Sequence, residues 1–168
     1  EAFKIKDEIL NNLSDGFEVL KVVKKERKRQ PAKPFITSTL QQEASRKLRF
    51  AARRTMGIAQ ELYTGIDLGE GSVGLITYMR TDSINLAQEA IDEIREIIPK
   101  LYGDNSLPDM VRQYSNTSKN AQEAHEAIRP TSLSRIPDDV KKNLSKDQFD
   151  LYSLIWKRTI ASQMNDAI

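Results

Sequence analysis

The chain has 168 residues, enough for one domain with part of a second, and its 39% hydrophobic and 30% charged residues are typical of a globular protein. There is no membrane-length apolar run, signal peptide pattern or cysteine, which fits a cytoplasmic protein without membrane contact, disulfides or thiolate metal sites. The net charge is only +2, yet residues 21–54 carry twelve Lys or Arg and two Glu, a density that suits a phosphate backbone or, equally, a solvated linker.

The N-terminal part is predicted to form a helix over 3–13, a strand over 17–23 and a linker over 24–34. The helix follows from apolar residues that recur on one face, and the strand from its β-branched and aromatic residues. The linker is highly charged and ends in two prolines, which indicates a domain boundary. Residues 1–33 are too few to form their own core, so we expect them to belong to a neighbouring domain.

Two helices are predicted next, over about 40–49 and 56–63, the second ending at Gly65. Apolar residues recur every four positions in the first, and a capping box is offered by Ser38 with a glutamine three residues later, or by Thr39 in the same way.

The glycine-rich stretch 66–74 is predicted to be a loop that leads into a short strand over 74–79. A helix over 86–98 should follow, capped by Asn85 and ended by Pro99.

A short helix is predicted over 121–128, and it should stop before Pro130 because the residue before a proline avoids the α region. Ser145 and Gln148 form a capping box for a final helix. The apolar stripe of that helix, expected to face the core, is Phe149, Tyr152, Trp156 and Ile160. The chain is therefore predicted to be mainly α with short β segments.

Tyr78 and Arg80 are the residues best suited to chemistry. In an extended segment, residues two apart point to the same side, so a phenol would lie beside a guanidinium. Positive charge favours the phenolate, and arginine can hold a phosphate while charge develops in the transition state. Taken by itself, a Tyr-x-Arg pair is more often a half-buried ring beside a surface charge.

His125 lies four residues before Arg129, so a helix would place both on one face. The imidazole could donate to a phosphate or transfer a proton. An exposed or capping histidine and a salt-bridged surface arginine explain the same pair.

Five stretches, in this order, resemble signature segments of one enzyme family. They are PFITSTLQQEASRKL, IAQELY, GLITYMRTDS, AQEAHEAIRPT and QFDLYSLIWKRTIASQM, which together extend from residue 34 to residue 164. The family is that of the type IA DNA topoisomerases, in particular bacterial topoisomerase I. Topoisomerase III-like members typically read Tyr-Pro-Arg where this chain has Met79 between Tyr78 and Arg80.

The resemblance implies roles for individual residues. Tyr78 matches the nucleophile that becomes linked to the 5′ phosphate of the broken strand, and Arg80 matches the arginine that contacts the scissile phosphate. His125 matches a histidine that assists DNA binding and cleavage. The further candidates for DNA contact are Gln60, Thr77 and Arg129.

The resemblance also implies a domain organisation. Residues 34–144 would form the helical gate domain, CAP-like or winged-helix-like, that carries the nucleophile. Residues 1–33 would be a piece of the β-rich arch that acts as a hinge, and residues 145–168 a helix returning toward it. Because the chain starts at Glu1 without Met, we expect a piece of a longer enzyme, inactive alone and able to dimerise through apolar surface that truncation exposes.

Type IA enzymes bind Mg²⁺ through clustered carboxylates in a separate toprim domain. This chain has no Asp-x-Asp-x-Glu cluster, so we expect no Mg²⁺ to be bound here.

The implied partners are the single-stranded segment of a negatively supercoiled duplex in the bacterial nucleoid and the remaining topoisomerase domains. The alternative is a non-catalytic helical nucleic-acid-binding module, in which Tyr78, Arg80 and His125 need not converge on one exposed face.

Overall fold

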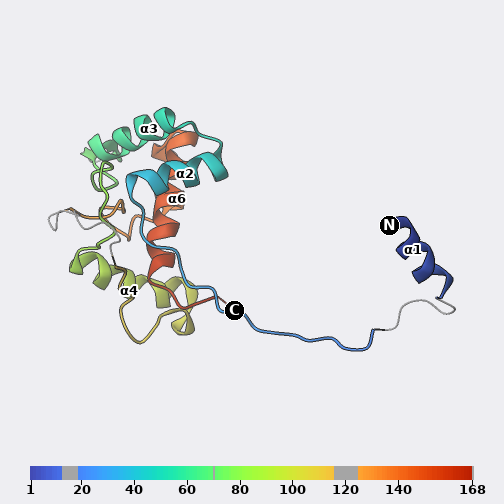
Figure 1. The fold of residues 1–168 in the computed structure, drawn as a ribbon. Coiled ribbons are helices and arrows are strands. Elements are labelled where there is room, and N and C mark those ends of the chain that lie inside the picture. Colours follow the sequence, from blue (N-terminus) through green and yellow to red (C-terminus); the bar gives the residue numbers. More distant parts are fainter. Residues whose placement is uncertain (13–18, 70, 116–124, 168) are drawn as a thin grey trace.

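The computed structural model describes residues 1–12, 19–69, 71–115 and 125–167. Within these ranges the chain is mainly α-helical, with six α-helices, two short 3₁₀ helices and one two-stranded sheet (Figure 1). This confirms the predicted fold class. None of the helices in the described ranges is long and apolar enough to cross a membrane.

The elements have the following order along the chain. They are α1 (Ala2–Asn11), α2 (Thr37–Leu48), α3 (Ala52–Thr64), β1 (Ile66–Asp67), β2 (Ser72–Val73), α4 (Gln88–Tyr102), η1 (Asp104–Ser106), α5 (Pro137–Val140), η2 (Lys141–Asn143) and α6 (Lys146–Ser162).

The N-terminal helix lies apart from the other helices. α1 contains no buried residue, and an extended stretch separates it from the helical body (Figure 1). The predicted strand over 17–23 is wrong for residues 19–23, which are exposed and not in a strand, while residues 17 and 18 lie outside the described ranges. A strand needs the backbone hydrogen bonds of a neighbour, and among the described residues the first such contact after α1 is at Arg29, whose N–H donates to the carbonyl of Ala167 at 2.8 Å.

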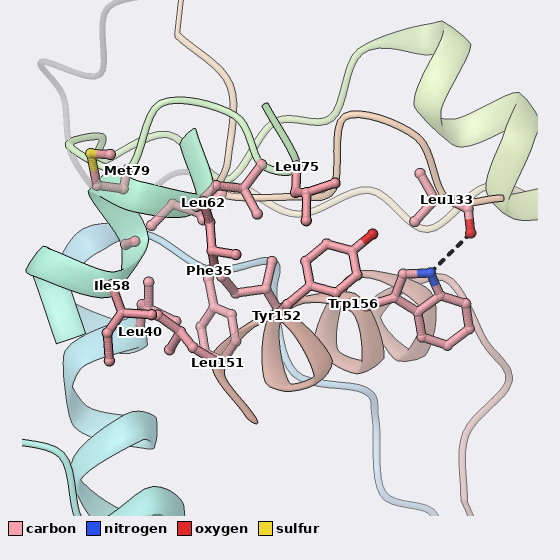
Figure 2. Packing of buried hydrophobic residues seen from close by; sticks show 14 of the residues in the cluster. Phe35, Leu40, Ile58, Leu62, Leu75, Met79, Leu133, Leu151, Tyr152 and Trp156 are labelled. Carbon is pink, nitrogen blue, oxygen red and sulfur yellow. Dashed lines mark hydrogen bonds between the residues drawn. The ribbon is translucent and has the colours of Figure 1, made fainter. Parts of the chain in front are cut away.

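The core forms where α6 packs against α2 and α3 (Figures 1 and 2). Tyr152, Trp156 and Ile160 are buried as predicted, whereas Phe149 is only partly buried. The polar atoms of the two large aromatic side chains are satisfied within the core. The Tyr152 hydroxyl donates to the carbonyl of Arg135 at 2.7 Å, and the Trp156 indole N–H donates to the carbonyl of Leu133 at 2.9 Å. These two hydrogen bonds attach α6 to residues 133–135, which follow residues 125–131 in the chain.

The helix starts agree only in part with the sequence predictions. The capping box of α6 is confirmed, because the Ser145 hydroxyl accepts from the Gln148 N–H (3.3 Å) and the Gln148 side chain accepts from the Ser145 N–H (2.9 Å). At α2 the predicted boxes with glutamine are wrong. The Thr39 hydroxyl accepts from the N–H of Ile36 at 3.0 Å instead, so a threonine satisfies this backbone group.

The predicted limits of α4 are wrong at both ends. The helix begins after Ala87, not after Asn85, and it continues through Pro99. A proline removes one N–H from the helical ladder, but the buried side chains of Ile94 and Ile98 keep this turn packed on the core. Tertiary burial therefore outweighs the local signal to stop.

The stretch 66–74 is more ordered than the predicted loop. Its β1 and β2 strands form a small antiparallel hairpin in which Ile66 pairs with Val73. The Asn143 side chain donates to the carbonyl of Asp67 at 3.0 Å, which attaches the hairpin to the segment before α6. The two-stranded sheet therefore lies between residues 66 and 73, in a stretch that was predicted to be a loop.

Candidate active site

The segment that carries Tyr78 is extended but is not a regular strand. Ile76 forms a single antiparallel bridge with Pro130. Next to it, the Thr77 N–H donates to the carbonyl of Arg129 at 2.9 Å, and the Thr131 N–H donates to the carbonyl of Leu75 at 3.0 Å. Two motifs that are some fifty residues apart in the sequence therefore lie side by side.

Tyr78 and Arg80 are both exposed, and the residue between them is buried. Tyr78 is 50% exposed and Met79 is 1% exposed, because its side chain inserts into the core (Figure 2). Arg80 is exposed as well. This order presents the phenol and the guanidinium to solvent while the buried methionine fixes the segment, and the chain bends at Met79 and Arg80.

Tyr63, at the end of α3, contacts Tyr78. Their ring centroids are 5.4 Å apart with an interplanar angle of 66°, an edge-to-face arrangement. The end of α3 is also hydrogen-bonded to the segment that carries Tyr78, since the Leu75 N–H donates to the carbonyl of Leu62 at 2.7 Å. A Cβ on Gly74 would lie 2.7 Å from the carbonyl oxygen of Tyr63, so only glycine allows this approach. The sequence reasoning missed Tyr63, whose only signal is its place at the end of the IAQELY motif.

Arg80 and His125 line one pocket of about 600 Å³. The start of α2 forms the opposite part of this pocket. The residues that line it are Ile36, Thr37, Ser38, Gln41, Arg80, Thr81, Asp82 and His125. Tyr78 is not among the lining residues, but it is two positions from Arg80. The structure thus brings Arg80 and His125 to one solvent-accessible hollow, and Tyr78 lies outside its lining, two positions before Arg80 in the chain.

The predicted helix over 121–128 is wrong in its described part. Residues 121–124 lie outside the described ranges, and residues 125–128 are not helical. Instead, backbone hydrogen bonds to distant segments hold these residues. In one of them, the Ile128 N–H donates to the carbonyl of Phe35 at 2.8 Å. His125 and Arg129 therefore do not share a helical face.

The remaining candidate residues make mainly internal contacts. The Arg129 guanidinium donates to the Glu126 carboxylate at 2.7 Å and is mostly buried. The Thr77 hydroxyl donates to the carbonyl of Ala127 at 2.7 Å and accepts from the Arg129 N–H at 3.0 Å. The exposed side chain of Gln60 donates to the Thr64 hydroxyl at 3.1 Å. Thr77 thus links the segment that carries Tyr78 to the segment that carries Arg129. Among Gln60, Thr77 and Arg129, only Gln60 has an exposed side chain.

Glu93 on α4 fixes the segment that follows Pro130. Its carboxylate accepts from the Ser132 hydroxyl and from the Ser134 N–H, both at 2.8 Å. Burial raises the pKa of Glu93, but hydrogen bonds from the backbone of Leu133 and Ser134 and from the serine hydroxyls outweigh burial, so the pKa is lowered overall.

We expect Glu93→Gln to lower the free energy of unfolding by about 1–2 kcal/mol at pH 7, because hydrogen bonds to a charged acceptor are lost. The folded-state pKa lies below the unfolded one, so the contribution of the carboxylate is complete above the unfolded pKa and is lost as the pH falls through the folded pKa. Urea unfolding at pH 7 and near pH 3 measures this. An equal difference between wild type and variant at both pH values would contradict the assignment.

Comparison with known proteins places these features in a family. Residues 2–168 match the family described as DNA topoisomerase. DNA topoisomerase 1 of Rickettsia bellii is 59% identical over 155 residues, which cover 92% of this chain and 19% of that protein. DNA topoisomerase 1 of Xylella fastidiosa (strain Temecula1) is 66% identical over 148 residues, 88% of this chain and 18% of that protein.

A solved structure gives the same result. Full-length topoisomerase I from Thermotoga maritima superimposes with a TM-score of 0.72 at 44% identity, over 83% of this chain and 22% of that chain. The chain spans 18–20% of the length of the curated relatives named DNA topoisomerase 1. With the family match over nearly all of its residues, the chain belongs to the bacterial type IA DNA topoisomerases, as its sequence motifs predicted.

Proposed function

We propose that this chain is the part of a type IA DNA topoisomerase that carries the nucleophile, and that Tyr78 cleaves one DNA strand. The observation that carries the proposal is the exposed phenol of Tyr78 beside the exposed Arg80, with the buried Met79 between them. A ring that served only packing would be expected in the core, where Tyr152 lies. The proposed substrate is a single-stranded segment of negatively supercoiled DNA.

The proposed step is a transesterification. The Tyr78 oxygen forms a bond to the phosphorus of a phosphodiester, the bond from phosphorus to the 3′ oxygen breaks, and the phenolic proton ends on that leaving oxygen. One phosphodiester replaces another, so the reverse reaction reseals the strand without ATP. Passage of a second strand between the two steps would relax the supercoil.

Arg80 is proposed to hold the scissile phosphate, and His125 to assist from the same pocket. A guanidinium donates two parallel hydrogen bonds to phosphate oxygens, and it stabilises the charge that develops during transfer. An imidazole at the rim of the pocket can donate to a neighbouring phosphate. The location of Arg80 and His125 in one pocket, with Arg80 two positions from Tyr78 in the chain, supports this division of roles.

A catalytically silent nucleic-acid-binding module is the second candidate. It is favoured by the basic residues 21–54, of which three form ion pairs within the fold. Arg46 and Lys47 share the single carboxylate of Glu43, which lies in the same segment, and Arg54 pairs with Asp147. Such a module would not require an exposed Tyr-x-Arg segment whose backbone is hydrogen-bonded both before Tyr78 and after Arg80. The enzyme is therefore the better proposal.

Mg²⁺, which the family implies for the full-length enzyme, has no fitting site among the described residues. Within those ranges no group of three or more histidine, aspartate or glutamate side chains could hold a metal ion. We therefore assign Mg²⁺ to the parts of the full-length relatives that lie beyond this chain, and we derive no step of the reaction from it.

The direct test is to map the DNA-linked residue. A full-length protein that contains this chain would be incubated with a labelled oligonucleotide, denatured to trap the covalent complex and digested for mass spectrometry. We expect the nucleotide on Tyr78. Tyr63, whose ring is only 5.4 Å away, serves as an internal control. A nucleotide on Tyr63 or on a residue outside this chain would reject the proposal.

A further inference from the structure

Thr37, the first residue of α2, is bonded to the backbone on both sides of Arg80. Its hydroxyl hydrogen is shared between the carbonyls of Met79 (2.8 Å) and Thr81 (3.0 Å), and its oxygen accepts from the Thr81 N–H at 2.9 Å. The Thr37 N–H also donates to the carbonyl of Thr81 at 3.0 Å. One residue, more than forty positions away in the sequence, therefore holds both peptide groups that flank the arginine.

We propose that Thr37 is a positioning residue for Arg80 in strand cleavage, an inference that rests on the function proposed above. Thr37 and Arg80 line the same pocket, and the Thr37 hydroxyl is partly buried beneath the arginine backbone. In this proposal Thr37 affects the rate of cleavage only through the position of Arg80. It is therefore a positioning residue and not a catalytic residue.

A matching arrangement lies on the other side of the motif. The Thr77 hydroxyl bonds to the carbonyl of Ala127 and the N–H of Arg129, just before Tyr78. Two threonine hydroxyls thus fix the backbone at either end of the Tyr-Met-Arg tripeptide, and the core holds the methionine at its centre. The side chains that must meet the phosphate remain exposed on a backbone with little freedom to move.

This rigidity has a kinetic consequence. A guanidinium stabilises a transition state only if it is aligned with the phosphate oxygens when charge develops, and a displacement of about 1 Å can cost about 100-fold in rate. Without the Thr37 hydroxyl, the carbonyl of Met79 and the N–H of Thr81 lose their partner, and the backbone at Arg80 is held only by the Thr37 N–H and by the buried Met79. Binding of DNA depends on many contacts and should be less sensitive than cleavage.

The test uses the full-length protein with three variants. Thr37→Val keeps the shape and removes the hydroxyl, whereas Thr37→Ser restores it. Thr39→Val is the matched control, because the Thr39 hydroxyl lies in the same helical turn but bonds only to the backbone of Ile36, at 3.0 and 3.2 Å. The rate of covalent attachment is measured at saturating oligonucleotide, and non-covalent affinity is measured separately in variants that also carry Tyr78→Phe.

We expect Thr37→Val to slow attachment by about 10- to 100-fold with a much smaller change in affinity. Thr37→Ser should react close to the wild-type rate. Thr39→Val should lose stability through its helix cap but retain the rate, which separates positioning from general destabilisation. A Thr37→Val rate equal to that of Thr39→Val would overturn the inference, as would a Thr37→Ser variant as slow as Thr37→Val.

A double variant tests whether Thr37 acts through Arg80. If it does, Thr37→Val combined with Arg80→Ala should be no slower than Arg80→Ala alone, because the group being positioned is already gone. Losses that multiply would reject the coupling. An Arg80→Ala protein with the wild-type rate would reject the role proposed for Arg80, and an impaired Arg80→Ala with an unimpaired Thr37→Val would reject only the role of Thr37. The proposed function itself would fail only if the wild-type protein formed no adduct on Tyr78.

Discussion

Replacing Tyr78 with phenylalanine in the full-length protein is expected to reduce covalent attachment to DNA to background. The substitution removes only the phenolic oxygen and keeps the ring that contacts Tyr63 at 5.4 Å between centroids. Loss of a covalent nucleophile can lower turnover on the order of 10⁶-fold, because no alternative atom occupies the attacking position. The measurement is the yield of protein linked to a labelled oligonucleotide after denaturation.

Two controls make this result specific. Tyr63→Phe removes the other nearby phenol, and it should leave the yield of adduct largely unchanged. Non-covalent binding of DNA by the Tyr78→Phe protein should also be retained, since Arg80 and His125 still line their pocket. An adduct that persists in Tyr78→Phe would assign the nucleophile to a different residue.

Trp156→Ala should produce the largest loss of stability in the described fold, about 3–5 kcal/mol in the free energy of unfolding. Trp156 is 3% exposed and lies in the core beside Tyr152 (Figure 2). Removing the indole leaves a cavity and also deprives the buried carbonyl of Leu133 of its hydrogen bond at 2.9 Å. Urea unfolding of the 168-residue chain, followed by circular dichroism, measures the loss.

Two further variants divide this loss into its parts. Trp156→Phe fills most of the space but leaves the Leu133 carbonyl unpaired, at a cost of about 1–3 kcal/mol. Lys157→Ala, at the adjacent exposed position of α6, should change stability by no more than about 0.5 kcal/mol. A Trp156→Ala protein as stable as Lys157→Ala would show that α6 is not part of the core.

The core prediction matters for the site because α6 supports the segment that pairs with the nucleophile segment. Trp156 and Tyr152 bind the carbonyls of Leu133 and Arg135, and the stretch just before them bonds to Leu75 and Thr77. A defect in α6 should therefore disturb the position of Tyr78 at a distance. The stability of the core and the geometry of the site are linked through this one segment.

Local features of the sequence were sufficient for some parts of this protein. The capping box of α6 involves residues three positions apart, and the buried stripe of α6 follows from helical periodicity. Tyr78 and Arg80 are both exposed, as their spacing of two residues predicted, although the chain bends at Met79 and Arg80. The motifs also identified the family, which the comparisons support independently. These are properties of residues that are neighbours in the chain.

Only the tertiary structure decided the rest. The stretch from His125 to Arg129 has the composition of a helix, but its backbone groups find partners in Phe35 and Thr77, and bonds to distant segments outweigh a weak local preference. Similarly, Pro99 fails to end α4 because buried residues of the same helix pack on the core. Residues 19–23 form no strand, because no strand among the parts of the chain that the structure describes pairs with them. The contacts of Thr37 with Met79 and Thr81 join residues 42 and 44 positions apart, and no local pattern encodes such a pairing.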